Sequence, residues 1–233
     1  REVWQTTSGD VLSKLENFPA FVSRESMTKF VGRQELFMKQ LNVHGSIVEL
    51  GVGQGAGLFT WAQLSAIFEP ANYNREVIGF DSFTGFPTIS EQDRVHPDNG
   101  SSPKRGGFAP RFGSKEQLEA ISRVHDLTRF LGHMPKVRLI EGDIATSVPE
   151  FLNKNRHLII SLLNIDVDLY APTISALDHL LPRIPKGGIV IFDELNVRNF
   201  PGETIAICER LGLSNVRLRR LAHVPCLSYI VIE

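Results

Sequence analysis

The chain has 233 residues, 42% of them hydrophobic and 22% charged, and a formal net charge of -1. This composition is ordinary for a globular domain with one buried core. The balanced charge argues against nucleic acid as a partner, and no apolar run approaches the roughly 20 residues that a helix needs to cross a bilayer. Two cysteines are too few for a disulfide framework. We therefore expect a cytoplasmic, single-domain protein that binds neither nucleic acid nor a membrane.

Residues 1–45 are predicted to form a helical segment that packs on the core. Apolar residues within 24–41 recur at helical spacing, which predicts an amphipathic helix. A shorter helix is predicted at 11–18, before Pro19. We interpret this segment as scaffold, and the alternative is a cap over a cofactor or a contact between copies. A homo-oligomer, a dimer or larger, is expected.

A strand, a glycine-rich loop and a helix follow one another from residue 46 to residue 68. The apolar run 46–50 predicts the strand, and 58–68 predicts the helix. Glycines stand between them at alternate positions, Gly51, Gly53, Gly55 and Gly57. Such a loop lets a ligand lie against bare backbone, beside the electropositive amides that open the helix. We expect it to bind a nucleoside with a charged tail.

Glu49, directly before the loop, favours one such ligand over another. A carboxylate there disfavours a pyrophosphate but can bind the ammonium group of an amino-acid tail, as in S-adenosylmethionine (SAM). Gly51, Gly53 and Ala56 also fit the dinucleotide-binding pattern, so a nicotinamide-dependent oxidoreductase stays open as an alternative. We predict that SAM contacts Glu49 and the glycines at 51, 53 and 55.

Two further strands place acidic residues beside this loop. The second strand ends in Asp81, and a parallel strand-helix-strand unit brings Asp81 to the same sheet edge as the glycines. A carboxylate there can accept hydrogen bonds from ribose hydroxyls, so Asp81 and the adjacent Ser82 are predicted cofactor contacts. The third strand is followed by Asp143 and Ile144, which are predicted to meet the adenine edge. The alternative is a helix-capping or turn role for Asp81 and a plain turn role for Asp143.

The segment 88–114 is rich in Gly, Pro, Ser and charged residues and has no regular apolar pattern. A loop of this length inside a compact domain is usually functional or disordered. We interpret it as a lid on the substrate side. Its Lys104, Arg105 and Arg111 would bind an anion if the substrate carries phosphate, and simple solvent exposure is the alternative.

Two helix starts have the spacing of a capping box. Ser114 and Gln117 predict a helix whose apolar residues continue to Leu131. Ser147 and Glu150 predict a shorter helix that ends near residue 153. Both helices are expected on the faces of the sheet.

Two apolar runs, typical of parallel strands covered on both faces, each end in a pair of acidic residues. These residues are Asp166, Asp168, Asp193 and Glu194. Like charges crowded at a poorly solvated edge raise one another's pKa values or recruit a cation. Oxygen-only ligands suit Mg²⁺ or another hard divalent ion. The alternative is that one or two of them cap helices or pair with Arg198.

The last two strands, predicted at 216–221 and 227–232, have no helix between them and are expected to form an antiparallel hairpin. The preceding strands alternate with helices, which is typical of an α/β fold with a doubly wound, mostly parallel sheet and helices on both faces. No linker divides the chain. Residues 46–233 are therefore predicted to form one domain.

Five segments together closely resemble the macrocin O-methyltransferase family: ELGVGQG, FDSFTGFP, EGDIATSVPEFL, NIDVDLYAPT and GGIVIFDE. The match covers about residues 24–195. The resemblance implies the class I methyltransferase (Rossmann-like) fold, with seven strands of which the last is antiparallel. It also implies SAM-dependent methylation of a hydroxyl on a small-molecule acceptor, such as a nucleotide-linked or glycosidic deoxysugar or a similar natural product.

The resemblance also implies roles for the carboxylates. The family's metal ligands correspond to Asp166, Asp193 and Glu194, and its proposed general base corresponds to Asp168, so Asp166 and Asp168 would face the methyl group. The chain has Val167 where members usually have glycine and Glu194 where they usually have aspartate. Besides the oxidoreductase, two classes stay open: a non-catalytic binder of SAM or a metabolite, and a relative of the cephalosporin hydroxylase branch.

Overall fold

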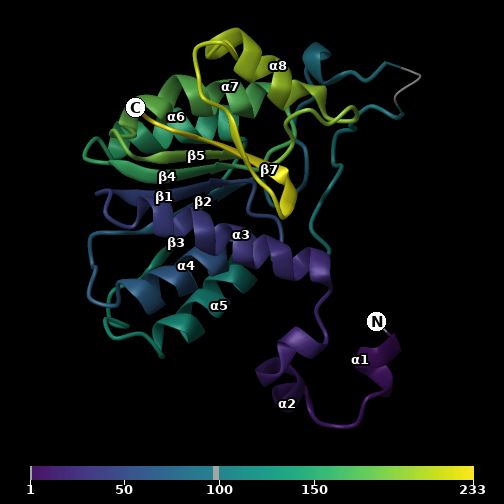
Figure 1. Cartoon of the computed structure of the whole chain (residues 1–233), viewed down its shortest axis with the longest axis vertical. Coiled ribbons are helices and arrows are strands. Elements are labelled where there is room, and N and C mark those ends of the chain that lie inside the picture. The colour runs from purple at the N-terminus through teal and green to yellow at the C-terminus, as the bar shows by residue number, and fades with distance from the viewer. Residues whose placement is uncertain (1, 97–99) are drawn as a thin grey trace.

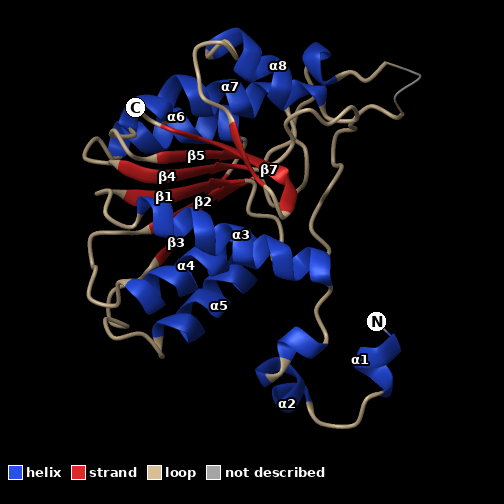
Figure 2. Cartoon of the chain, viewed as in Figure 1, coloured by secondary structure: helices blue, strands red, loops and turns tan. Residues whose placement is uncertain are grey.

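The computed structural model describes residues 2–96 and 100–233. Residue 1 of the predicted N-terminal segment and residues 97–99 of the predicted lid lie outside the described residues. A sheet lies between two layers of helices (Figures 1 and 2). Its strands are β1 Ser46–Leu50, β2 Val77–Asp81, β3 Val137–Glu141, β4 Ile160–Ile165, β5 Ile189–Phe192, β6 Arg219–Leu221 and β7 Val224–Val231. The helices are α1 Glu2–Thr6, α2 Val11–Glu16, α3 Arg24–Gln40, α4 Ala56–Phe68, α5 Lys115–Asp126, α6 Ile144–Lys154, α7 Tyr170–His179 and α8 Pro201–Arg210.

The seven strands of the sheet are ordered β3-β2-β1-β4-β5-β7-β6. Strands β1 to β5 pair in parallel, whereas β7 pairs antiparallel with both β5 and β6. This confirms the predicted doubly wound sheet and its closing antiparallel hairpin. The predicted hairpin bounds are wrong: β6 begins at Arg219 and β7 at Val224, so a two-residue turn joins them in place of the longer loop that the predicted bounds 216–221 and 227–232 imply. The chain leaves β1 toward β2 on one side and returns to β4 on the other, so the carboxyl ends of β1 and β4 flank a topological switch point, where open α/β sheets bind their ligands.

Each face of the sheet has its own apolar core. In β1, Ile47 belongs to the cluster that includes Trp61 of α4, while its neighbour Val48 belongs to the cluster on the opposite face. This alternation follows from the two-residue period of a strand. Helices α3, α4 and α5 cover the first face and α6, α7 and α8 cover the second (Figure 1). Because both faces are covered, a ligand reaches the sheet at its edge.

Two predicted helix boundaries are wrong. Helix α5 starts after its Ser114 cap as predicted but ends at Asp126, and Leu127 and Phe130 are 84% and 77% exposed. The Arg129 guanidinium pairs with Asp126 at 2.7 Å and donates to the Met134 carbonyl, so the chain turns back where the apolar spacing predicted more helix.

The predicted capping box at Ser147 is also wrong. Helix α6 begins one turn earlier because the Asp143 side chain accepts a hydrogen bond from the Ala145 amide at 3.0 Å. The Ser147 amide donates to the Asp143 carbonyl, so Ser147 lies within the first helical turn. Asp143 therefore caps helix α6, a role that the sequence analysis did not assign to it.

Within the N-terminal segment, α3 packs on the sheet and the residues before it do not. Leu36 and Phe37 of α3 are fully buried, whereas α2 has no buried residue. Residues 2–20, which we call the arm, lie apart from the body in Figure 1. The arm exposes large apolar side chains, among them Val11, Leu12 and Leu15. In the part of the chain that the structure describes, no helix is both long and apolar enough to cross a membrane.

Candidate active site

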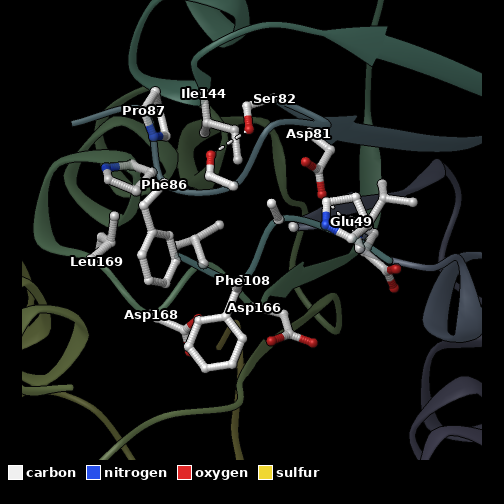
Figure 3. A pocket seen from close by; sticks show the side chains of 18 of the residues that line it. Glu49, Asp81, Ser82, Phe86, Pro87, Phe108, Ile144, Asp166, Asp168 and Leu169 are labelled. Carbon is white, nitrogen blue, oxygen red and sulfur yellow. Dashed lines mark hydrogen bonds between the residues drawn. The ribbon is translucent and has the colours of Figure 1, made fainter. Parts of the chain in front are cut away.

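A cavity of about 840 Å³ opens at the carboxyl ends of β1, β2 and β4 (Figure 3). Most of the predicted cofactor and catalytic residues line it, namely Glu49, Gly51, Gly53, Asp81, Ser82, Asp143, Ile144, Asp166 and Asp168. Three predicted residues, all of them described, do not line it: Gly55, Asp193 and Glu194. The cavity therefore brings together most of the residues predicted to bind a nucleoside and two of the four clustered carboxylates, Asp166 and Asp168.

The glycine loop fixes the floor of the cavity. Gly51 has a φ of +84°, and a Cβ atom there would overlap the carbonyl oxygen of Asp166, so β1 and β4 approach closely only because residue 51 is glycine. A Cβ at Gly53 would meet nothing within 4 Å, so the backbone there borders open space. Gly55 instead closes the turn into α4, donating its amide to the Val52 carbonyl at 2.9 Å.

Glu49 is buried and held by its own neighbours. Its Oε2 accepts hydrogen bonds from Trp61 Nε1 at 2.7 Å and from Asn164 Nδ2 at 3.2 Å. A Cβ at Gly57 would clash with this carboxylate, so that glycine makes room for it. Burial raises the pKa of Glu49, and the positive charge of Arg33 opposes the rise. The carboxylate is thus rigidly placed at the rim of the glycine loop.

Asp81 ties the loop to the second strand. Its two carboxylate oxygens accept hydrogen bonds from the amides of Gly53 and Phe83, each at 2.7 Å. The neighbouring Ser82 donates its hydroxyl to the Gly85 carbonyl at 2.6 Å. Both side chains line the cavity while shaping its backbone. Carboxylate oxygens have spare lone pairs, so these bonds leave Asp81 able to accept further hydrogen bonds.

Asp166 and Asp168 project from the end of β4, across the cavity from Ser82 and Ile144 (Figure 3). Burial first, and then the charges of Asp193 and Asp168, raise the pKa of Asp166 well above its usual value. Burial and then the charge of Glu194 raise the pKa of Asp168 to about 7. A carboxyl with a pKa near neutrality is suited to accept and release a proton.

Asp193 and Glu194 follow β5, beside a lysine from the N-terminal helix. Lys29 Nζ lies 4.0 Å from Asp193 Oδ2, and Asp193 Oδ1 is buried without a hydrogen-bond partner. Among residues 2–96 and 100–233, no group of three or more His, Cys, Asp or Glu side chains is arranged to hold a metal ion. The metal site at Asp166, Asp193 and Glu194 gains no support from this geometry and stays a prediction.

Sequence reasoning missed three charged residues of the site. Lys29 and Arg33 of α3 both line the cavity, and their spacing of four residues within an amphipathic helix was the only available signal. Glu203 of α8 is fully buried, and its Oε1 accepts a hydrogen bond from the Glu194 amide at 3.4 Å. An acidic residue in a first helical turn is normally an exposed partner of the helix dipole, so the sequence offered no sign of its burial.

The crowded carboxylates predict an unusual dependence of stability on pH. An acid whose pKa is higher in the folded chain than in the unfolded chain stabilises the fold at low pH, and this contribution is lost as the pH rises through the folded value. For Asp168 that window runs from its ordinary value of 3.8 to about 7, at about 1.4 kcal/mol per pKa unit. Burial raises five more pKa values in the same direction, those of Glu49, Asp93, Asp166, Glu194 and Glu203.

We therefore expect the melting temperature in EDTA to fall between pH 5.5 and pH 8, by about 3 °C or more. Calorimetry across this range measures it, with Asp168→Asn expected to flatten part of the slope. A melting temperature that rises steadily over the same range would contradict the crowding of these carboxylates.

The sheet order and the cavity at its switch point define the class I methyltransferase fold. The model of the macrocin-O-methyltransferase (TylF) family matches residues 21–206. The chain belongs to this family.

Individual relatives share the fold over nearly the whole chain. A crystal structure of CalS11, described as a calicheamicin methyltransferase, is 36% identical with a TM-score of 0.93 and covers 99% of this chain and 88% of its own. An apo structure of CalS11, described as a TDP-rhamnose 3'-O-methyltransferase of calicheamicin biosynthesis, is 33% identical with a TM-score of 0.83 and covers 99% and 90%.

A curated relative matches a shorter part of the chain. It is the 8-demethyl-8-(2,3-dimethoxy-alpha-L-rhamnosyl)-tetracenomycin-C 4'-O-methyltransferase of Streptomyces olivaceus, 29% identical over 160 residues. The match takes in 65% of this chain and 53% of that protein, so the chain spans about half the length of this relative.

Proposed function

We propose that this chain is a SAM-dependent O-methyltransferase that acts on a sugar hydroxyl in natural-product biosynthesis. The observation that carries the proposal is the single cavity shared by the glycine loop, Asp81 and the carboxylates Asp166 and Asp168. Family membership supports the same reaction class. No comparison favours the nicotinamide-dependent, hydroxylase or non-catalytic alternatives.

The residues on the glycine-loop side fit SAM. Glu49 would hold the amino-acid tail, the bare backbone at Gly53 borders open space for it, and Asp81 would accept hydrogen bonds from the ribose. The adenine would lie near Asp143 and Ile144. When bound, SAM supplies a methyl group on a positively charged sulfur. The chain's own contribution is to exclude water and to orient the acceptor toward that group.

Asp168 is the proposed general base. A sugar hydroxyl is a poor nucleophile near neutral pH, so a group that removes its proton accelerates methylation, typically by 10² to 10⁴-fold. The carboxylate of Asp168 lines the cavity, and its pKa of about 7 lets it accept this proton near neutral pH. Asp166 would stand beside it and help to place the hydroxyl.

A second part of the proposal is that Mg²⁺ assists the reaction. The oxygen-only donor set of Asp166, Asp193 and Glu194 suits a hard divalent ion, and the orphaned Asp193 Oδ1 has a free coordination position. Such an ion would lower the pKa of a bound hydroxyl. The side chains are not gathered into a metal site within the described residues, and Lys29 offers a positive charge at the same place.

The acceptor that we propose is a hydroxyl of a rhamnose-type deoxysugar. Two relatives carry rhamnose or a rhamnosyl group in their names. Phe86, Phe108 and Leu169 line the cavity on the side away from Glu49 and Asp81 (Figure 3). This apolar side suits the apolar face of a deoxysugar. Of the three lid cations considered above, Arg111 lines the cavity and would face a diphosphate if the sugar is nucleotide-linked.

The first test is isothermal titration with SAM, S-adenosylhomocysteine and NADH, each with Mg²⁺ and with EDTA. Micromolar binding of both adenosyl ligands and no heat from NADH are expected. Absence of adenosyl binding under both conditions would refute the proposal.

Methyl transfer from radiolabelled SAM then separates the two acceptor sources. TDP-L-rhamnose and a rhamnosyl glycoside are offered in parallel, and Arg111→Ala is expected to raise KM for the nucleotide-linked sugar alone. Transfer to neither acceptor by a chain that binds SAM would refute the rhamnose assignment.

Light scattering tests the predicted homo-oligomer, which the exposed apolar side chains of the arm support.

A further inference from the structure

Asp93 is a buried carboxylate of the lid that also accepts a hydrogen bond from a residue outside the lid. It ends the 3-10 turn Glu91–Asp93, and only 1% of its surface is exposed. Its Oδ2 accepts a hydrogen bond from the Ser90 amide at 2.7 Å, which closes a capping box within the lid. Its Oδ1 accepts a hydrogen bond from the Tyr170 amide, also at 2.7 Å. One side chain therefore joins the lid to the chain that follows β4.

The Tyr170 amide opens helix α7, and the proposed base stands two residues before it. The residue that precedes α7, Leu169, makes no side-chain capping bond, so Asp93 caps this helix from a distant part of the sequence. Asp168 has a φ of +61°, a left-handed conformation that is uncommon outside glycine, although aspartate adopts it more often than most residues do. The bond at Tyr170 fixes the backbone immediately beyond that residue.

Helix α8 packs against the same junction. A Cβ atom at Gly202 would overlap Asp93 Oδ1 and would lie 2.5 Å from the Tyr170 nitrogen. The lid also contacts the start of α8 through an aromatic pair, because the ring centroids of Phe108 and Phe200 lie 5.8 Å apart. The position of Asp93 is thus set by three elements, and residue 202 has no side chain because the carboxylate occupies that space.

We propose that Asp93 is a positioning residue that couples the lid to the placement of Asp168. The inference rests on the proposed function, since it assumes that Asp168 is the base. Loss of the Asp93 bond would loosen the backbone between Asp168 and Tyr170 and let Asp168 leave its left-handed conformation. Small misplacements of a reacting group are costly in rate. The glycine loop and Asp81 are not part of this junction, so SAM binding would be unaffected.

The experiment compares three variants of the full chain. Asp93→Ala removes both bonds, Asp93→Asn keeps an oxygen for the Tyr170 amide, and Gly202→Ala keeps Asp93 but places a methyl group in its space. Asp126→Ala is the matched control, because it removes a largely buried ion pair with Arg129 that lies outside the cavity. Each is measured for kcat, for KM of both substrates, for affinity toward S-adenosylhomocysteine, and for amide hydrogen exchange at Tyr170.

Asp93→Ala and Gly202→Ala are expected to lower kcat by about 100-fold, with affinity for S-adenosylhomocysteine unchanged and protection of the Tyr170 amide lost. Asp93→Asn is expected to recover about tenfold of that loss, since one hydrogen bond returns. Asp126→Ala is expected to lower the melting temperature and leave kcat unchanged.

Wild-type kcat in Asp93→Ala, or an equally protected Tyr170 amide, would overturn the proposal. An equal loss of kcat in Asp93→Ala and Asp93→Asn would also overturn it, because the negative charge of Asp93 and not its hydrogen bond to the Tyr170 amide would then account for the effect. Failure of the wild-type chain to bind SAM would refute the proposed function instead. The exchange measurement needs no substrate and still tests the junction in that case.

Discussion

Replacement of Asp168 by asparagine is expected to lower kcat by about 10³-fold, while the affinity for S-adenosylhomocysteine stays within about twofold. Asparagine keeps the size of the side chain but cannot accept the proton of an acceptor hydroxyl as a base. It also tolerates the left-handed backbone that residue 168 adopts, with a φ of +61°. Loss of activity in this variant would therefore report on the proton and not on the backbone.

Single-turnover methylation and calorimetric binding measure the two quantities separately. Asp178→Asn is the control, because Asp178 forms an exposed ion pair with Arg210 and does not line the cavity. It is expected to keep full activity. Unchanged turnover in Asp168→Asn would remove Asp168 from the role of base, and loss of S-adenosylhomocysteine binding would assign it to the cofactor site.

The fold could be predicted from the sequence because its signals are local and mutually consistent. The sequence predicts one unit from the apolar run at 46–50, the glycines after it and the helix that follows. Strand β1 has the bounds predicted for that run. The buried runs that became β4 and β5 lie side by side as expected. Helix ends were harder, because α5 ends through the pairing of Arg129 with Asp126, a contact that apolar spacing does not encode.

The candidate site likewise has residues that the sequence could predict and residues that it could not. Residues at the carboxyl ends of parallel strands must meet at one edge, so Glu49, Asp81, Asp166 and Asp168 could be placed together from the sequence. Lys29 comes from a helix whose packing angle against the sheet decides which of its side chains reach the cavity. Such placement depends on tertiary packing, which no local pattern specifies.

Carboxylates buried by long-range packing were the least accessible to prediction. Asp93 lies in an irregular segment and Glu203 in the first turn of α8, and both positions look solvent-exposed in sequence. Each is buried only because distant elements cover it, as Gly202 and the Tyr170 amide do for Asp93. The sequence therefore predicted which residues meet at the edge of the sheet but not the buried residues that support them.

Gly51→Ala is expected to destabilise the chain by about 3 kcal/mol or more and to abolish measurable binding of S-adenosylhomocysteine. Two effects add at this position. A side chain is strained at a φ of +84°, and its Cβ would overlap the Asp166 carbonyl oxygen. Because the Asp166 amide donates to the Leu50 carbonyl at 3.0 Å, the overlap would push the end of β4 away from β1 and move the carboxylates with it.

Urea unfolding and calorimetric binding test this prediction, and Gly106→Ala separates strain from overlap. Gly106 has a φ of +74°, close to that of Gly51, but a Cβ there meets nothing within 4 Å. We expect Gly106→Ala to cost only the backbone strain, about 1 kcal/mol. Equal stability losses in the two variants would show that β1 and β4 can separate without penalty. The close approach of the two strands would then not be what holds the glycine loop and the carboxylates in one cavity.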